Sequence, residues 1–289
     1  MRIAVIGCGY LGAVHAACMA EIGHDVVGLD VDEDRISRLA RGEAPFHEPG
    51  FPELLTRGVA TGRLGFTTDP RQLADADLVF IGVGTPQLSG RLGADLSQVD
   101  AAVEVIVEHV APRPGVPVLV AGKSTVPVGT AQRLAERLEA SGKDFLLAWN
   151  PEFLREGHAI ADTLHPDRIV YGLPEDRETG ERAKAILDSC YAPMLAEGIP
   201  LVVANLPTAE LVKVAANAFL ATKISFINAM AELCDATGGD VTRLAEAIGH
   251  DDRIGGKFLQ AGIGFGGGCL PKDLRAFMAR AGGLGIDQT

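Results

Sequence analysis

A single cysteine lies where a run of glycines meets a proline. The segment Gly264–Asp273 places Cys269 after four glycines and two residues before Pro271. Glycines let a backbone approach a ligand closely, and proline favours the first position of a helix, so Cys269 is expected just outside a helix N-terminus. The positive end of that helix, with Lys272 nearby, would favour the thiolate and make Cys269 a nucleophile. The local sequence equally allows a buried cysteine in a glycine turn.

A second pattern with chemical meaning opens the chain. An apolar strand at 3–6 runs into a glycine turn and a helix to about residue 22, and a strand at 26–29 ends at Asp30. This order is the dinucleotide-binding fingerprint, in which the glycines permit the tight turn, the approach of the pyrophosphate and close helix–strand packing. Asp30 is expected to accept from the ribose hydroxyls and to repel a 2′-phosphate, which favours NAD over NADP, whereas Arg35 works against that preference. Cofactor contacts in the turn are therefore predicted at Gly7, Gly9, Tyr10, Leu11 and Gly12.

Three later strands are predicted, each followed by a polar segment. Ligands of open parallel sheets bind at the carboxyl ends of the strands, so these segments are expected to line one crevice. Thr85 and Thr125 would hydrogen-bond the cofactor there, or else make ordinary turn and capping contacts. Asp95–Gln98 is predicted to form a helix capping box. The strands are at 78–83, 118–121 and 145–148, and the polar segments are Gly82–Pro86, Lys123–Pro127 and Asn150–Gly157.

A long helical run carries a row of polar side chains. It begins at Pro207 and continues to about Ala236 without glycine or proline. A helix of this length is expected to join the cofactor domain to a smaller helical region and to offer a dimer contact. Glu210, Lys213 and Asn217 fall at i, i+3 and i+7, which places them in one row with apolar neighbours on both flanks. That arrangement predicts a face turned into a cleft rather than a solvated ion pair.

The order of these elements predicts an α/β fold. We expect a doubly wound, mostly parallel Rossmann-type sheet, followed by a smaller all-helical domain with a long connecting helix. A strand at 168–172, a helix at 178–190 and a strand at 201–204 extend the sheet. We assign 1–205 to an NAD-binding domain and 206–289 to a helical and dimerisation domain that carries Cys269.

Composition excludes several classes of function. The 289 residues, 47% of them hydrophobic, can build one large or two ordinary domains. A net charge of −12 without a Lys/Arg-rich block argues against nucleic acid and against an anionic membrane surface as partners. The five cysteines are scattered and show no C-x-x-C spacing, so neither a disulfide framework nor a metal site is expected. We recognise no signal peptide and no apolar run long enough to span a bilayer, and therefore expect a cytoplasmic protein.

Together these motifs resemble the nucleotide-sugar 6-dehydrogenase family, which includes the UDP-glucose and GDP-mannose dehydrogenases. The resemblance covers essentially the whole chain and implies a four-electron oxidation of a sugar's primary alcohol to a carboxylate, with two NAD molecules used in succession. It also favours the nucleophile over the buried thiol as the interpretation of Cys269. The likeness is carried by Gly7–Gly12, Lys123–Pro127, Asn150–Gly157 and Gly264–Asp273, together with Lys213 and Asn217.

The resemblance implies a role for each catalytic residue. Cys269 attacks the aldehyde halfway through the oxidation, which gives a thiohemiacetal and then a thioester. Lys213 and Asn217 match residues that stabilise the alkoxide oxygen. Glu152 matches the carboxylate that handles the hydrolytic water, and Asp273 matches an acid that assists proton movement through water.

Further contacts are implied by the same resemblance. Thr125 and Glu156 match positions near the nicotinamide. Arg253 resembles an arginine that reaches the substrate, in some members from a partner subunit, so a homodimer through the long helix is expected. Phe153, Leu154, Lys257, Phe258 and the Gly264–Gly268 loop, which includes Gly266, match substrate contacts. Independently of the resemblance, Thr85, Arg35 and Lys272 are also expected to contact the cofactor.

The identity of the sugar rests on a shorter stretch. His165–Val170 is similar to the UDP-glucose members, and the Glu-Arg-Val-Leu-Pro-Gly pattern of the N-acetylhexosamine enzymes is absent, so UDP-glucose is favoured and GDP-mannose comes next. Family members usually continue into a C-terminal domain that closes over the nucleotide. That domain is expected to be absent here, which would leave the reacting centre wet and turnover feeble.

Two other functions remain open from the sequence. Two-electron β-hydroxyacid dehydrogenases also join a Rossmann domain to helices that carry a Lys-x-x-x-Asn pair, and they need no nucleophilic cysteine. The chain could alternatively be a truncated NAD-binding fragment that does not turn over.

Overall fold

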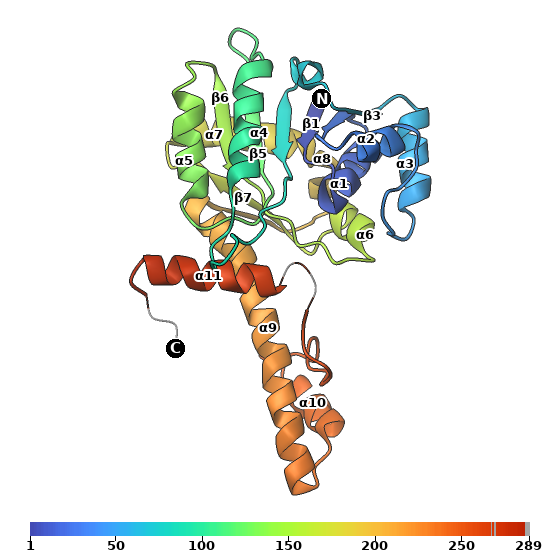
Figure 1. The fold of residues 1–289 in the computed structure, drawn as a ribbon, viewed down its shortest axis with the longest axis vertical. Coiled ribbons are helices and arrows are strands. Elements are labelled where there is room, and N and C mark those ends of the chain that lie inside the picture. The colour runs from blue at the N-terminus through green and yellow to red at the C-terminus, as the bar shows by residue number, and fades with distance from the viewer. Residues whose placement is uncertain (267, 269, 287–289) are drawn as a thin grey trace. The chain divides into compact units, whose positions relative to one another are not determined.

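The structure is a computed structural model that describes residues 1–266, 268 and 270–286 (Figure 1). The chain divides into two compact units. The first unit comprises Met1–Pro86 and Asp95–Leu211, and the second comprises Gln87–Ala94 and Val212–Thr289.

An eight-stranded sheet forms the centre of the first unit, with the order β3-β2-β1-β4-β5-β6-β7-β8. The first six positions have the strand order of a dinucleotide-binding Rossmann fold. Neighbouring strands are parallel except β6 and β7, which confirms the predicted doubly wound, mostly parallel sheet. The strands are β1 (Arg2–Ile6), β2 (Asp25–Leu29), β3 (Leu64–Thr67), β4 (Leu78–Ile81), β5 (Val118–Gly122), β6 (Phe145–Trp149), β7 (Ile169–Leu173) and β8 (Leu201–Asn205).

Helices cover both faces of this sheet. The chain moves one way from β1 to β2 and the other way from β4 to β5, so right-handed crossovers place α1 and α4 on opposite faces. The C-terminal end of α7 lies on the α1 face, where Cys190 Sγ is 3.8 Å from Met19 Sδ. The helices are α1 (Tyr10–Glu21), α2 (Glu33–Ala40), α3 (Phe51–Ala60), the 3-10 turn η1 (Pro70–Leu73), α4 (Ser97–His109), α5 (Thr130–Glu139), α6 (Ala159–Leu164), α7 (Arg177–Cys190) and α8 (Ala192–Ala196).

The predicted capping box is wrong. Helix α4 begins at Ser97, so Leu96 occupies the N-cap position and its apolar side chain makes no cap hydrogen bond. The Asp95 carboxylate instead accepts from the Ser97 N–H at 2.9 Å, as in an Asx turn that precedes the helix.

The second unit is built around the long helix α9 (Leu206–Thr237), which belongs to it from Val212 onward, with α10 (Val241–Gly249) and α11 (Leu270–Gly283). Lys223 on α9 donates to the carbonyl oxygens of Ile254 and Gly255 at 3.0 and 3.2 Å, and the Asn228 side chain accepts from Gly262 N–H at 2.9 Å. These bonds hold the segment after α10 against α9.

Two local expectations in this unit need correction. Helix α11 begins at Leu270, so Pro271 occupies the second helical position rather than the first. Helix α9 is long and apolar enough to cross a bilayer, contrary to the expectation that no run reaches that length. One such helix is weak support for a membrane span, because the criterion uses length and composition alone and the core helix of a soluble protein also meets it.

Candidate active site

The glycine turn of the first unit leaves space where a dinucleotide pyrophosphate would bind. Gly7 has φ +94°, and a Cβ there would lie 2.8 Å from the Val83 backbone. A Cβ on Gly12 would lie 1.8 Å from the Gly7 carbonyl oxygen, whereas a Cβ on Gly9 would meet nothing within 4 Å. Gly9 is the N-cap of α1, and the first helical turn carries no acidic side chain. Tyr10 and Leu11 begin the helix, so open space adjoins a positive helix terminus, which fits an anionic pyrophosphate.

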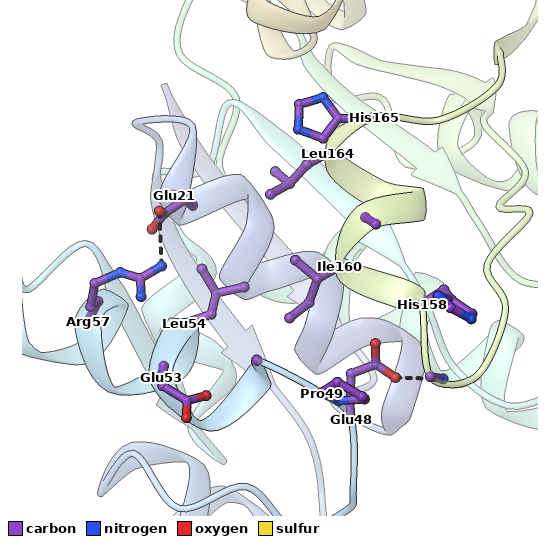
Figure 2. A pocket seen from close by; sticks show the side chains of 13 residues that line it. Glu21, Glu48, Pro49, Glu53, Leu54, Arg57, His158, Ile160, Leu164 and His165 are labelled. Carbon is purple, nitrogen blue, oxygen red and sulfur yellow. Dashed lines mark hydrogen bonds and ion pairs between the residues drawn. The ribbon is translucent and has the colours of Figure 1, made fainter.

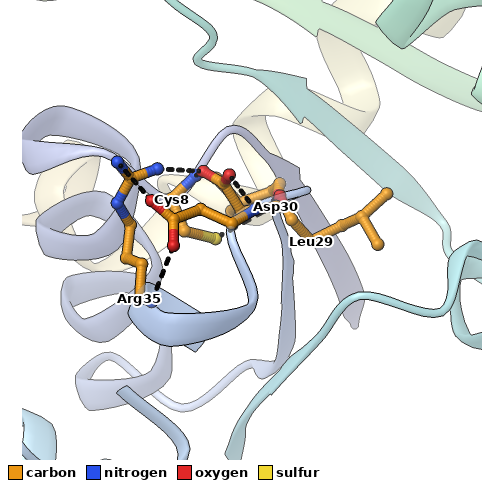
Figure 3. Close-up of polar contacts among 6 residues, drawn as sticks. Cys8, Leu29, Asp30 and Arg35 are labelled. Atoms are coloured by element: carbon orange, nitrogen blue, oxygen red, sulfur yellow. Dashed lines mark hydrogen bonds and ion pairs between the residues drawn. The ribbon is translucent and has the colours of Figure 1, made fainter. Parts of the chain in front are cut away.

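The acid after β2 is held directly beside this turn (Figure 3). The Asp30 carboxylate accepts from the Cys8 N–H at 2.7 Å and from the Asp32 N–H at 3.1 Å. It also pairs with Arg35 at 3.0 Å, while the second guanidinium nitrogen of Arg35 pairs with Asp32 at 3.1 Å. Arg35 is thereby committed to two carboxylates. The structure thus brings together the turn and the predicted ribose acid.

Two threonines meet at the carboxyl ends of β4 and β5. The Thr85 hydroxyl donates to the Thr125 carbonyl oxygen at 2.8 Å, and the Thr85 side chain is buried. The two predicted cofactor contacts therefore come from neighbouring strands and support each other.

The loop after β6 carries the predicted Glu152. Its carboxylate accepts from the Leu154 N–H at 2.6 Å, which ties the side chain to its own loop. The Arg168 guanidinium lies 3.8 Å from the centroid of the Phe153 ring, a cation–π contact that orients the ring. Glu156, further along the loop, is exposed.

A cluster of predicted residues also forms within the second unit. The Asn217 amide on α9 donates to Asp273 Oδ2 at 2.8 Å, and Lys272 pairs with Asp273 Oδ1 at 2.6 Å. Asp273 is only 2% exposed, and each of its carboxylate oxygens has one of these partners. Lys213, one helical turn before Asn217, is also buried. Cys269, next to Leu270 in the chain, lies outside the described residues.

The third member of the predicted polar row serves a different purpose. The Glu210 carboxylate accepts from the N–H groups of Gly129 and Ala131 at 2.8 and 2.7 Å. It is 2% exposed and satisfies backbone donors at the start of α5. Glu210 is therefore a helix cap, while Lys213 and Asn217 remain the candidates for chemistry.

The segment after α10 holds the remaining predicted substrate contacts. Arg253 is exposed and pairs with Asp251 at 2.6 Å. Phe258 has φ +63°, a left-handed conformation that is strained for a bulky residue and is often retained at ligand sites. Lys257 and Gly266 are exposed.

Lys123 is a buried cation that the sequence did not single out. Its ammonium donates to the Asn150 side-chain oxygen at 2.9 Å and lies 5.3 Å from the centroid of the Phe80 ring. Tyr191 donates to the same Asn150 oxygen at 2.6 Å. Burial lowers the pKa of Lys123 to about 8. Its position after a predicted strand was visible in the sequence, but the aromatic rings around it come from distant segments.

A separate pocket of about 630 Å³ opens in the first unit between α1, α3 and α6 (Figure 2). Among the described residues, none of those named as a cofactor, substrate or catalytic contact lines it, although Gly157, the last residue of the predicted polar segment Asn150–Gly157, does. Glu48, at its edge, is 2% exposed and is the second residue that sequence reasoning missed.

Comparison with known proteins assigns both parts of the chain. Residues 1–195 match the NAD binding domain of the UDP-glucose/GDP-mannose dehydrogenase family, and residues 207–289 match the central domain of that family. The chain is 46% identical to UDP-glucose 6-dehydrogenase TuaD of Bacillus subtilis over 98% of its own length. It spans 60% of the length of that relative.

Solved structures agree with this assignment. A UDP-glucose dehydrogenase from Pyrobaculum islandicum superposes with a TM-score of 0.90 at 42% identity, covering 99% of this chain and 65% of that one. A GDP-mannose dehydrogenase from Pseudomonas aeruginosa gives a TM-score of 0.80 at 34% identity, covering 99% and 66%.

Proposed function

The chain belongs to the UDP-glucose/GDP-mannose dehydrogenase family, and on that premise we propose that it takes part in the NAD-dependent oxidation of UDP-glucose to UDP-glucuronate. The observation that carries the choice of sugar is the 46% identity to UDP-glucose 6-dehydrogenase TuaD over 98% of the chain. The GDP-mannose dehydrogenase of known structure is less similar, at 34% identity.

The first unit would hold the cofactor. Gly9 and the first amides of α1 would bind the pyrophosphate, and Asp30 would accept from the adenine-side ribose. Bound NAD would supply a hydride acceptor for each of two successive oxidations of the same sugar carbon. Thr125 and Glu156 would lie by the nicotinamide.

Cys269 would hold the half-oxidised sugar. The primary alcohol first loses a hydride and its hydroxyl proton and becomes an aldehyde. The Cys269 thiolate then adds to the carbonyl carbon, which forms a C–S bond and an alkoxide. Loss of a second hydride from that carbon gives a thioester, and water cleaves the C–S bond to release the carboxylate and the thiol.

The charges that develop in these steps would be met by buried polar side chains. The Lys213 ammonium and the Asn217 amide would stabilise the alkoxide. Asn217 has two amide hydrogens, and one of them bonds to Asp273, so the amide is already oriented. Glu152 would take the proton of the hydrolytic water, and Asp273 would help to move protons through water.

We further propose a homodimer through α9. Phe219, Phe226 and Leu233 are exposed and lie seven residues apart along the helix. Residues at this spacing share one side of a helix, and a row of exposed large apolar side chains is typical of an interaction surface.

Product analysis tests the proposed reaction. The purified chain is incubated with NAD and either UDP-glucose or GDP-mannose, with and without a separately supplied C-terminal domain of a relative. The proposal predicts UDP-glucuronate and two NADH per molecule of product. One NADH per sugar with an aldehyde product would indicate a two-electron dehydrogenase. Preferential consumption of GDP-mannose would show that GDP-mannose, not UDP-glucose, is the substrate.

A further inference from the structure

The loop between α2 and α3 brings one buried carboxylate to two distant segments. Glu48 Oε2 accepts from the Tyr10 hydroxyl and from the Gly157 N–H, the latter at 2.8 Å. Glu48 Oε1 accepts from the Ala159 N–H at 2.8 Å. Only 2% of the Glu48 surface is exposed, so three protein donors, rather than water, form hydrogen bonds with this carboxylate.

Aromatic packing reinforces the same connection. The Phe46 ring lies 5.0 Å from the Tyr10 ring and stacks on Phe51 at 5.0 Å with an interplanar angle of 15°. Phe51 is fully buried at the start of α3. Tyr10 is therefore held both by the hydrogen bond of its hydroxyl and by the contact of its ring with Phe46.

The two segments joined by Glu48 both belong to the proposed cofactor site. Tyr10 is the first residue of α1 and follows Gly9, whose surroundings fit the pyrophosphate. Gly157 follows Glu156, which is proposed to lie by the nicotinamide. Tyr10 and Gly157 also contact each other, because the Gly157 N–H reaches the Tyr10 hydroxyl at 3.2 Å.

We propose that Glu48 is a positioning residue for the NAD site, which fixes the start of α1 and the Glu156–Gly157 loop relative to each other. The inference rests on the NAD-binding part of the proposed function. Glu48 itself touches neither cofactor nor substrate in this account. It acts through Tyr10 and through the backbone of Gly157.

A purely structural role would leave a different signature. The bond to Ala159 satisfies a donor at the start of the six-residue helix α6, which by itself contributes only to stability. The bonds to Tyr10 and Gly157 lie outside that helix. If they position the cofactor site, their loss must change NAD affinity in the folded protein.

The test uses the whole chain and four variants, one of them a control. Glu48→Gln keeps the shape of the side chain but replaces one acceptor oxygen with a donor. Tyr10→Phe keeps the ring and removes only the hydroxyl, and the double variant completes a cycle. Glu53→Gln is the matched control, because Glu53 lines the same pocket, is exposed and lies only five residues away.

The measurements are the dissociation constant for NAD by calorimetry and the melting temperature without NAD. We expect NAD binding to weaken about tenfold in Glu48→Gln and severalfold in Tyr10→Phe, with a double variant no weaker than Glu48→Gln. Glu53→Gln should bind like the unaltered chain. A lower melting temperature with unchanged NAD affinity at a temperature where the variant is folded would overturn the proposal.

Two further outcomes are decisive. If Glu48→Gln does not fold, Tyr10→Phe alone decides, and unchanged NAD affinity in that variant contradicts the proposal. If the unaltered chain binds no NAD, the cofactor assignment itself has failed, which is a separate result.

Discussion

At the scale of single residues, Asp30 and Arg35 explain why the site is expected to prefer NAD. Asp30 lies against the Cys8 N–H, where a ribose would approach the glycine turn. Arg35 lies beside Asp30, but its two terminal guanidinium nitrogens pair with Asp30 and Asp32 at 3.0 and 3.1 Å. A 2′-phosphate would therefore meet carboxylates before it met a free guanidinium.

Replacing Asp30 with alanine should reduce that discrimination. The variant removes a ribose acceptor and releases one arm of Arg35, so NAD should bind about tenfold more weakly and NADP more tightly. Calorimetric titration with each cofactor gives the ratio of the two dissociation constants. A ratio equal to that of the unaltered chain would contradict this account of Asp30 and Arg35.

Lys123 shows what the burial of a charged residue does to stability. Its pKa is lowered from 10.5 to about 8 in the folded chain because burial penalises the ammonium. Between these two values the unfolded chain binds more protons than the folded chain, so stability rises with pH. The stability gained when Lys123 loses its proton is fully present above pH 10.5 and is lost as the pH falls to about 8.

We therefore compare the unfolding free energy of the unaltered chain with that of Lys123→Met. The difference should shift by about 2 kcal/mol in favour of the unaltered chain between pH 7 and about pH 9.5. Urea unfolding of both proteins at each pH measures this difference. In the unfolded chain the thiols of Cys8 and Cys18 also titrate in this range, whereas burial raises their pKa in the folded chain. Both proteins carry these thiols, so their effect cancels in the difference. A difference that does not change with pH would show that Lys123 keeps an ordinary pKa.

The residues of the candidate site were predictable to different degrees. The glycine turn and Asp30 were visible because strand, turn, helix and acid follow one another in the sequence. Glu48 was not visible, because its partner Gly157 lies 109 residues away and nothing in the local sequence indicates burial. Glu210 was visible as part of a polar row, but its role as a cap of α5 depends on a contact 81 residues away.

At the scale of elements, the turn that leads into α1 contains one glycine needed for packing and another that leaves space for the cofactor. Gly12 packs α1 against the end of β1, while Gly9 faces open space and has φ −65°, which alanine can adopt. The two glycines therefore have different physical reasons to be glycine.

Alanine substitutions should separate these roles. Gly12→Ala forces a Cβ into the Gly7 carbonyl and should destabilise the chain by about 3 kcal/mol or more. Gly9→Ala should change stability by less than about 1 kcal/mol, since only the N-cap residue changes, and should weaken NAD binding at least about tenfold by filling the space of the pyrophosphate. Urea unfolding and NAD titration of both variants check this. Normal NAD affinity in a folded Gly9→Ala chain would show that the pyrophosphate does not bind beside Gly9.

Most strands of the sheet and the long helix were predictable, whereas the elements between β2 and β4 were not. The strands β1, β2, β5 and β6 are mainly apolar, and α9 has neither glycine nor proline after Pro207. The sequence did not predict β3, a four-residue strand with an exposed glycine at its second position. It also did not predict the neighbouring helices α2 and α3. These elements depend on packing against β2 and α1, which local sequence does not encode.

At the scale of the whole molecule, the chain combines a cofactor unit with a helical unit, and the proposed chemistry draws on both. Thr125 and Glu152 belong to the first unit, and Lys213, Asn217 and Asp273 belong to the second. Neither unit by itself carries all of the residues assigned to the reaction.

The proposed dimer is testable at this scale. Phe226→Asp puts a charge into the exposed apolar row on α9 and should convert a dimer into a monomer in sedimentation velocity. Ser225→Asp is the matched control, because this exposed position lies about 100° around the helix and should leave the dimer intact. A Phe226→Asp chain that sediments as a dimer would place the interface elsewhere.

The most direct test of the central claim is mass spectrometry of the peptide that contains Cys269. Glu152→Gln should slow hydrolysis of the thioester, so acid quenching of this variant during turnover with UDP-glucose and NAD should trap the sugar as an acyl adduct on Cys269. The account predicts that adduct, and it predicts no UDP-glucuronate from Cys269→Ala. Accumulation of UDP-glucuronate without any adduct, or its formation by Cys269→Ala, would contradict it.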